Sequence, residues 1–388
     1  MESSSEPPVS LGTIVREWGR IGIIGFGGPP AHIALLRERC VENNQWISHQ
    51  DFEDAIAATN LLPGPASTQL AIFLAWRLRG TLGAFVGGLC FIAPGLTIIL
   101  LLSALFLSGH PPMWMLGIAA GAGAAVPAVA LHAAVGLVPG SWKRLGDSEW
   151  RKRRWCCYAL VGALSAATVG PYLVLALVIC GVIEVLIERP AAPKARLASF
   201  NPLLLIALAS VGSLSAVAWV AFKVGALSYG GGFVIIPLMQ HDAVTTYHWM
   251  TQGQFLNAVA LGQITPGPVV QTVAVVGYAA AGLGGGLLAA LIAFGPSFAF
   301  VLIGGPHFLR LSANQRLQAF LTGAGATSIG AIAGSSIPLG LALSHLWQLC
   351  ILGGALLWFL VAKRNVVIGL ILAGGLGAIA ALLGAPVH

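Results

Sequence analysis

Long apolar segments recur along the whole chain, separated by short stretches that are polar or rich in glycine and proline. A helix needs about 20 apolar residues to cross a hydrocarbon core of about 30 Å. We expect membrane-crossing helices in ten runs: 11–36, 54–76, 82–108, 113–138, 155–187, 203–239, 255–281, 285–309, 317–343 and 346–386. The pattern predicts an all-α, multi-pass membrane protein.

The last run of each half is long and interrupted. Gly170-Pro171 breaks 155–187, and Lys363-Arg364-Asn365 breaks 346–386, so each run is predicted to form a hairpin of two short helices. Between the halves, residues 188–201 carry basic residues and prolines, which is typical of a surface linker. We therefore divide the chain into an N-terminal repeat (1–187), a linker (188–201) and a C-terminal repeat (202–388).

The two halves repeat each other. When the first half is shifted by 203 positions it falls on the second without a gap for about sixty residues. The aligned pairs include Gly27-Gly28 with Gly230-Gly231, Trp46 with Trp249, Phe52 with Phe255, Pro63-Gly64-Pro65 with Pro266-Gly267-Pro268, and Gly83 with Gly286; later, at a shift of 202, Gly121 meets Gly323. Two tryptophans and two Pro-Gly-Pro triplets in one register indicate an internal duplication.

Composition narrows the class of protein. The chain has 388 residues, of which 57% are hydrophobic and 9% charged, against about 25% charged in an ordinary soluble domain. The net charge of +7 (20 − 13) comes from basic residues between apolar runs, which predicts loop anchors and no nucleic-acid surface. The six cysteines form no metal-binding pattern, so we expect no bound metal. No catalytic motif appears, so we expect a protein that has no cofactor and is not an enzyme.

The basic loops alternate between the halves. Arg77, Arg79 and a cluster at 143–154 follow spans whose second-half equivalents hold no basic residue except His345. Conversely, basic residues at 310–316 and 363–364 have no basic equivalents in the first half. Under the positive-inside rule this predicts an inverted-topology repeat. Inversion needs an odd number of crossings between equivalent points, so either 203–239 holds an extra crossing or 155–187 is one bent span.

Two elements in each half break the helical pattern inside apolar surroundings. One is Gly25-Phe26-Gly27-Gly28-Pro29-Pro30 with its mate Ser228-Tyr229-Gly230-Gly231-Gly232-Phe233, and the other is the Pro-Gly-Pro triplet. Broken backbone at membrane depth is tolerated where protein buries it or where it lines a cavity. Four paired breaks predict discontinuous helices that meet near the midplane and form a substrate site, the alternative being close helix packing.

The triplets suit an anion. Pro63 tends to end the helix before it, and Pro65 suits the first turn of the helix after it. The amides of Gly64, Ala66 and Ser67 should then lack intrahelical partners at the positive end of a helix dipole, which binds oxyanions. Polar side chains flank both triplets and either bind the anion or join helices: Asn60, Thr68 and Gln69 in the first half, and Gln263, Gln271 and Thr272 in the second.

Charged residues inside the spans are few. Arg20 and Lys223 are equivalent, and each precedes its Gly-Gly pair by seven residues on the same helix face. A cation inside the membrane is a candidate for function, although both could also extend to the interface. Glu17, His32, Asp54 and Glu184 are weaker candidates, as proton carriers without charged equivalents.

The candidate substrate-binding residues are Arg20, Gly27, Gly28, Asn60, Pro63, Gly64, Pro65, Ser67, Thr68, Gln69, Lys223, Tyr229, Gly230, Gly231, Gln263, Pro266, Gly267, Pro268, Gln271 and Thr272.

These paired motifs carry a resemblance. F-G-G-P, W-I-S-x-x-x-F and P-G-P, duplicated as Y-G-G-G-F, W-M-T-x-x-x-F and P-G-P, resemble the chromate ion transporter family in its long-chain, two-domain form. The resemblance implies an inner-membrane carrier that exports chromate, with sulfate as the natural competitor. Pro29-Pro30 stands where the second half has Gly232-Phe233, so the two half-sites differ.

We therefore expect a secondary transporter in the bacterial inner membrane that confers chromate resistance by alternating access, driven by the membrane potential or a proton gradient. A carrier of sulfate or another tetrahedral oxyanion is the alternative, and an anion channel is a more distant one. The polar start of the chain lacks signal-peptide features, so the N-terminus is expected to stay cytoplasmic. The expected partners are an oxyanion and the lipid bilayer; proton coupling and a homodimer are left open.

Overall fold

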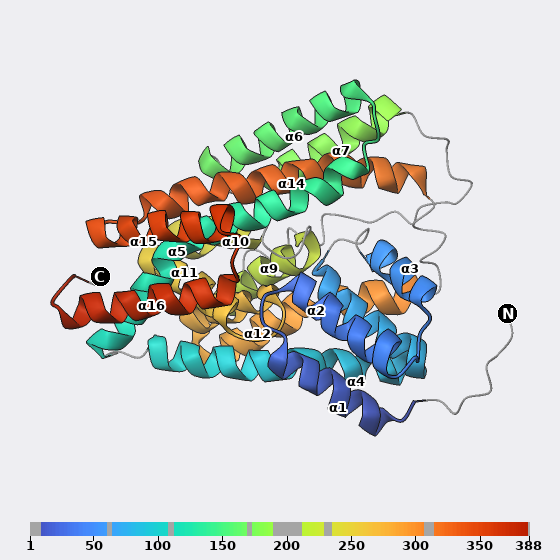
Figure 1. Ribbon diagram of the computed structural model, residues 1–388, viewed down its shortest axis with the longest axis horizontal. Helices are drawn as coiled ribbons and strands as arrows, with labels where there is room; N and C mark the ends of the chain where they lie inside the picture. The colour runs from blue at the N-terminus through green and yellow to red at the C-terminus, as the bar shows by residue number, and fades with distance from the viewer. Residues whose placement is uncertain are drawn as a thin grey trace, which may run out of the picture.

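The computed structural model describes residues 9–59, 64–107, 112–168, 173–188, 212–228, 235–305 and 314–386, and these residues form helices without a strand among them (Figure 1). The first repeat contains α1 (Leu11–Ile24), α2 (Pro29–Arg37), the π-helix η1 (Glu38–Asn43), α3 (His49–Thr59), α4 (Ala66–Phe106), α5 (Met113–Lys143), α6 (Glu149–Thr168) and α7 (Leu173–Glu188). The second contains α9 (Gly212–Leu227), α10 (Ile235–Gln240), the π-helix η4 (His241–Thr246), α11 (Gln252–Ile264), the 3₁₀ turn η5 (Val269–Gln271), α12 (Thr272–Gly304), α14 (Gln315–Leu341), α15 (Leu346–Leu356), the π-helix η7 (Leu357–Val361) and α16 (Val366–Leu382).

The Gly-Gly break of the first repeat is the tip of a helical hairpin. Near the tip, Nε2 of His32 on α2 lies 2.9 Å from the carbonyl oxygen of Gly25, which follows α1. Farther from the tip, Arg39 on η1 lies 3.9 Å from the carboxylate of Glu17 on α1. These two contacts mean that α2 and η1 run back along α1, antiparallel to it. In the second repeat, Lys223 on α9 is ion-paired with Asp242 on η4, so the equivalent helices fold back in the same way.

The Pro-Gly-Pro triplet is also the tip of a hairpin. Asp51 at the start of α3 lies 3.5 Å from Arg77 near the end of the first arm of α4, so the chain reverses direction between them. In the second repeat, a methyl group on Gly262 of α11 would lie 1.9 Å from the hydroxyl oxygen of Thr272 on α12. At the described tips the chain reverses between two antiparallel helices, where the sequence suggested discontinuous helices; residues 60–63 and 229–234 of the predicted breaks lie outside the described residues.

The helix α4 itself bends sharply into two arms. Arg79 and Gly80 leave helical geometry, and the φ of Gly80 is +63°. A methyl group on Gly83 would lie 2.3 Å from the carbonyl oxygen of Ala75, and one on Gly88 would lie 2.9 Å from Ile72. Residues so far apart in sequence touch only if the second arm runs back along the first. This bend separates the runs 54–76 and 82–108. The run 54–76 itself reverses at the triplet, and 11–36 reverses at the Gly-Gly break, so neither is the single crossing helix that the sequence suggested.

The same bend recurs in α12 and corrects the register of the repeat. It falls at Ala281 and Gly282, whose backbone angles match those of Arg79 and Gly80. The shift between equivalent residues is therefore already 202 here, and Gly83 corresponds to Gly285 instead of Gly286. The second repeat begins this arm with the 3₁₀ turn η5, whereas α4 begins directly as an α-helix.

The long helices α5 and α14 interlock the two repeats. Helices α6 and α7 of the first repeat pack against α14 of the second, and α15 and α16 of the second repeat pack against α5 of the first. Small residues allow close contact: a methyl group on Gly330 would lie 1.8 Å from the carbonyl oxygen of Ala159, and one on Gly121 would lie 2.2 Å from that of Ala373. Each repeat thus completes the packing of the other.

The run 155–187 forms two helices, as the hairpin prediction required. Arg154 on α6 binds Glu184 on α7 through two hydrogen bonds of 2.9 and 2.8 Å, and Arg151 binds Glu188. These pairings make α6 and α7 antiparallel, so the alternative of one bent span is wrong. The other alternative, an extra crossing in 203–239, includes 203–211 and 229–234, which lie outside the described residues. The run 346–386 also forms separate helices, divided at Lys363–Asn365.

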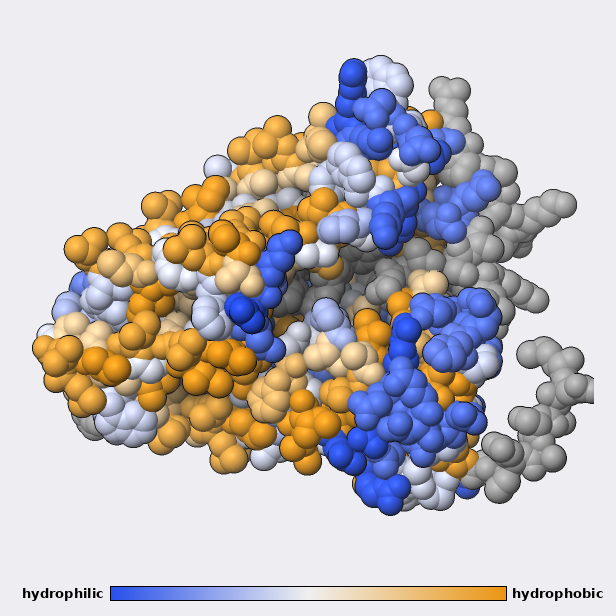
Figure 2. Space-filling view, viewed as in Figure 1, coloured by the Kyte–Doolittle hydropathy of each residue, from blue (hydrophilic) through white to orange (hydrophobic). Residues whose placement is uncertain are grey.

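By length and apolar composition, four helical segments of the described chain are candidates to cross a membrane: Ala66–Phe106, Met113–Lys143, Val269–Gly304 and Gln315–Leu341. The first and third of these bend back on themselves at Gly80 and Gly282. Shorter apolar helices lie at Leu214–Leu227, Leu346–Val361 and Val366–Leu382. Hydrophilic residues gather at one end of the molecule, over α1 to α3 and the adjoining ends of α6 and α7, while most of the remaining visible surface is hydrophobic (Figure 2). This distribution is typical of a helical membrane protein.

Candidate functional site

The hairpin tips of the two repeats contact each other through exchanged hydrogen bonds. The amide of Gly64 in the first triplet donates to the carbonyl of Ser228 at the second Gly-Gly break, with an N···O distance of 3.0 Å. The amide of Gly267 in the second triplet donates to the carbonyl of Gly25 at the first break, at 2.9 Å. Both partners are related by the shift of 203, so the two bonds are equivalent. Each triplet is thus held by the break of the other repeat.

Local backbone geometry explains why glycine and proline stand at the tips. Gly64 and Gly267 have φ angles of +121° and +99°, a region that favours glycine. The helix α11 ends at Ile264, and Thr265 is extended with ψ of 144°. Pro65 and Pro268 occupy the N-cap positions of the following helices, one residue before the first turn where the sequence placed them. The predicted helix breaks are confirmed at both described triplet segments.

The helix termini at the tips retain amides without an acceptor among the described residues, although the first triplet has one fewer than the sequence suggested. Gly64 was expected to offer its amide to an anion, but this amide is used by Ser228. The amides of Ala66, Ser67, Val269 and Val270 open the following helices, and they have no acceptor among the described residues. An α-helix leaves its first amides without intrahelical partners, and these amides lie at the positive end of the helix dipole.

Buried polar side chains gather around the same tips without hydrogen-bond partners in the described structure. Four of these atoms belong to groups that can donate: Thr68 Oγ1, Ser228 Oγ, Ser297 Oγ and Gln263 Nε2. Ser297 Oγ lies 3.5 Å from the position that a methyl group on Gly64 would occupy. Unpaired buried polar atoms are costly and rare, so this concentration makes the tips a candidate site for a polar ligand.

Gln271 and Thr272 stabilise the second triplet. Gln271 Nε2 donates to Thr265 Oγ1 at 3.0 Å and to the carbonyl of Pro266 at 2.8 Å, which leaves its own Oε1 buried without a described partner. Thr272 donates to the carbonyl of Val269 at 2.8 Å. In the first repeat, the amide of Gln69 lies against Gly64. The described hydrogen bonds of Gln271 and Thr272 thus stay within the second triplet segment, so they join no helices, and binding of an anion by these residues stays a prediction.

His32 lies at the centre of the contact between the repeats. Its ring is fully buried, Nε2 is 2.9 Å from the carbonyl of Gly25, and Nδ1 is 3.2 Å from the hydroxyl of Ser67. The carbonyl of Gly25 therefore receives both His32 and the amide of Gly267. Phe91 on the second arm of α4 meets the ring edge-on, with centroids 5.0 Å apart. The sequence gave His32 only a minor place, because its partners lie on other elements.

The two predicted cations are placed differently from each other. Arg20 is exposed on α1, and none of the ion pairs described in the structure includes it. Lys223 is partly buried and pairs with Asp242, while its ammonium also lies 5.7 Å from the ring of Trp219. From the sequence, Lys223 was expected to share a helix face with the Gly-Gly break of its repeat. Asp242 was not predicted as its partner, because the return of η4 along α9 is a tertiary contact.

The remaining candidate residues divide into two groups. Gly27 and Gly28 form the first break with positive φ angles of 98° and 74°, and a methyl group on Gly28 would lie 3.6 Å from Val269 of the second triplet segment. Asn60, Pro63, Tyr229, Gly230 and Gly231 lie outside the described residues. Ser228 was named from the sequence only as part of the second break, and Ser297 was not named, because neither has a polar equivalent in the first repeat.

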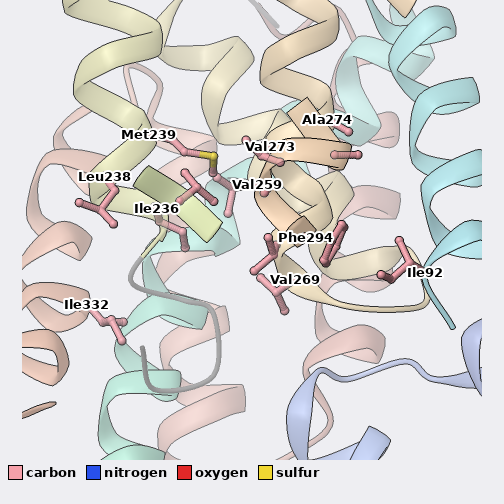
Figure 3. Close-up of a cluster of buried hydrophobic side chains, with 14 of the residues drawn as sticks. Ile92, Ile236, Leu238, Met239, Val259, Val269, Val273, Ala274, Phe294 and Ile332 are labelled. Atoms are coloured by element: carbon pink, nitrogen blue, oxygen red, sulfur yellow. The ribbon is translucent and has the colours of Figure 1, made fainter. Parts of the chain in front are cut away.

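Apolar side chains from both repeats pack around Val269, which follows the second triplet. Ile92 of α4 and Phe294 of α12 lie near Val269 in a buried hydrophobic cluster, which also receives Ile236 and Met239 from α10 (Figure 3). Such surroundings lower the local dielectric constant and strengthen hydrogen bonds and charges within them. The tips therefore combine unpaired donors with an apolar wall.

Comparison of the sequence with known protein families places the chain in one of them. The sequence profile of the chromate transporter family matches residues 12–185 and 215–380, so it matches once in each repeat. The chain belongs to the chromate transporter family. The two matched regions coincide with the internal duplication, and the hairpin tips of this family member lie inside them.

Individual relatives agree with this assignment. The chain is 34% identical to a chromate transport protein of Cupriavidus metallidurans over 343 residues, which cover 86% of this chain and 83% of the relative. It is 31% identical to a probable chromate transport protein of Synechococcus elongatus, covering 86% of each chain. A chromate transport protein of Pseudomonas aeruginosa is 31% identical, with 86% of this chain and 82% of the relative covered. No solved structure matches the chain.

Proposed function

We propose that this family member exports chromate across the bacterial inner membrane as a secondary transporter, and that its oxyanion site lies where the four hairpin tips meet. The observation that carries the proposal is the pair of exchanged bonds from Gly64 to Ser228 and from Gly267 to Gly25. They bring both helix termini and the unpaired hydroxyls of Thr68, Ser228 and Ser297 into one buried region. A tetrahedral oxyanion needs several donors at once, and this arrangement offers them from both repeats.

We further propose that the two repeats have opposite orientations in the membrane. Trp155 at the start of α6 donates to Ser141 near the end of α5 at 2.8 Å, so these consecutive helices are antiparallel. Gly330 and Gly334 of α14 meet Ala159 and Ala163 of α6 in the same order, so α14 runs parallel to α6. The equivalent helices α5 and α14 therefore run in opposite directions, which supports alternating access by exchange between two inverted halves (Figure 1).

Uptake of labelled chromate into everted inner-membrane vesicles tests the function. Export from the cytoplasm appears as accumulation inside such vesicles, and it should saturate with chromate concentration and fall when excess sulfate competes. Vesicles from the same strain without the protein are the control. Collapse of the membrane potential and of the proton gradient by separate ionophores identifies the driving force.

Three results would contradict the proposal. Absence of uptake above the control would exclude chromate export. Transport of sulfate with a higher kcat/KM than chromate would favour a sulfate carrier of the same architecture. Flux that rises without saturation and too fast for a carrier would favour a channel.

A further inference from the structure

The hydrogen bonds of His32 fix its tautomer when the ring is neutral. A carbonyl oxygen can only accept, so Nε2 must carry the hydrogen that it donates to Gly25. Nδ1 is then unprotonated and accepts the hydrogen of the Ser67 hydroxyl. In this state the Ser67 hydroxyl points its only hydrogen at His32 and cannot donate to a ligand at the tips.

Protonation of the ring reverses this bond. An added proton on Nδ1 makes both ring nitrogens donors, so Nδ1–H donates to the Ser67 oxygen. The Ser67 hydroxyl keeps its own hydrogen and can turn it towards an anion near the amides of Ala66 and Ser67 itself, which have no acceptor among the described residues. The uptake of one proton thus adds one donor to the tip and one positive charge behind it.

Among the described residues His32 has no charged partner, so the charge of a protonated ring is left for a bound anion. From α1 the ring meets the carbonyl of Gly25, and from α4 it meets Ser67 and Phe91. None of the ion pairs among the described residues includes His32, and no charged side chain of these residues interacts electrostatically with its ring. Lys223 is already paired with Asp242, and Arg20 is exposed. A desolvated dianion needs compensating charge, and His32 is the titratable side chain hydrogen-bonded at the described tips.

We propose that His32 and Ser67 form a proton-linked element of the oxyanion site, in which protonation of His32 turns the Ser67 hydroxyl from the imidazole to the bound anion. This inference rests on the proposed oxyanion function. The element belongs to the first repeat alone, because the equivalent positions in the second are Ile235 and Val270, which cannot titrate. It therefore makes one of the two helix termini responsive to pH and leaves the other unaffected.

Sulfate binding to the purified full-length protein provides the test, with inorganic sulfate as the probe because it stays a dianion over the pH range used. Calorimetric titration in two buffers with different ionisation enthalpies gives the number of protons taken up. We expect the wild-type protein to take up as much as about one proton per sulfate, and its affinity to fall by up to about tenfold for each unit of rising pH. Affinity falls as the pH rises because the neutral ring accepts the hydrogen of the Ser67 hydroxyl, which then cannot donate to sulfate.

The variants separate coupling from folding. His32→Gln retains an amide that can donate to Gly25 but cannot titrate, and it should bind sulfate without proton uptake. Ser67→Ala should bind more weakly with reduced uptake, whereas Ser67→Thr keeps the hydroxyl and should retain both. His248→Gln changes an exposed histidine and is the matched control, which should behave as wild type. Size-exclusion profiles and melting temperatures show whether each variant is folded.

Each outcome decides between the two proposals. If the wild-type protein binds neither sulfate nor chromate at any pH, the oxyanion function fails and this inference fails with it. If the wild type binds and a folded His32→Gln protein takes up the same number of protons, the inference alone fails. Should His32→Gln not fold, unchanged proton uptake by Ser67→Ala would overturn the inference.

Discussion

Pro266 ends α11 and keeps the second triplet out of helical geometry. The carbonyl of Pro266 receives Gln271, and the next amide, that of Gly267, reaches Gly25 in the other repeat. An alanine at 266 would let α11 continue, because alanine favours the helix and restores an amide. Continuation would withdraw the Gly267 amide from Gly25 and turn the amides of Val269 and Val270 away from the tips.

We therefore expect Pro266→Ala to raise the half-saturating chromate concentration by about tenfold, which corresponds to the loss of one hydrogen bond to a charged group. Transport normalised to inserted protein measures it. Pro338→Ala removes a proline inside α14 and serves as the matched control. An unchanged half-saturation in a normally inserted Pro266→Ala protein would argue against the triplet as part of the site.

At the scale of elements, each repeat closes its first hairpin with an ion pair of opposite polarity. In the first repeat, Glu17 on α1 lies near Arg39 on η1; in the second, Lys223 on α9 pairs with Asp242 on η4. Arg39 and Asp242 are equivalent at the shift of 203, so the position is kept while its charge is reversed. The pair therefore holds the hairpin closed, whichever helix supplies the cation.

Lys223→Gln should lower the stability of the folded protein by about 1–3 kcal/mol, because it leaves the carboxylate of Asp242 buried without its partner. Adding Asp242→Asn should restore most of this loss, since no uncompensated charge remains. Thermal melting of the purified variants measures both effects, and Lys143→Gln, which changes an exposed lysine, is the control. If the double variant regains stability but transports as poorly as Lys223→Gln, then Lys223 acts on the substrate as well.

At the scale of the whole molecule, the proposed opposite orientation of the two repeats can be tested by locating their basic residues relative to the membrane. In Figure 1, α14 begins at the end of the molecule where α1 to α3 gather. Arg79 marks the bend of α4, and Arg316 lies in the first turn of α14. Basic residues are retained on the cytoplasmic side of a membrane, so both positions should be cytoplasmic although they belong to different stages of their repeats.

Reporter fusions after Arg79 and after Arg316 should both report the cytoplasm, and a fusion after Ser344 should report the opposite side. The fusion at Ser344 is the control, because α14 separates it from Arg316 by one crossing. Opposite locations for Arg79 and Arg316 would contradict the inverted repeat.

The sequence by itself determined the class of protein, the duplication and the places where helices break. These features arise from properties that each residue carries with it: apolar side chains partition into lipid, proline lacks an amide hydrogen, and glycine tolerates a positive φ. Gly64 and Gly267 adopt such angles, and α11 stops before Pro266. The pairing of the repeats was visible because duplication leaves the same residue types in one register.

Only the tertiary structure decided what the breaks do. The hairpin reversal at each tip, the bonds from Gly64 to Ser228 and from Gly267 to Gly25, and the partner of Lys223 depend on helices that pack through space. The sequence offered the Gly64 amide to a ligand and gave no reason to join His32 with Ser67. A hydrogen bond depends on distance and direction to a partner, and for the triplet amides that partner stands more than 150 residues away along the chain.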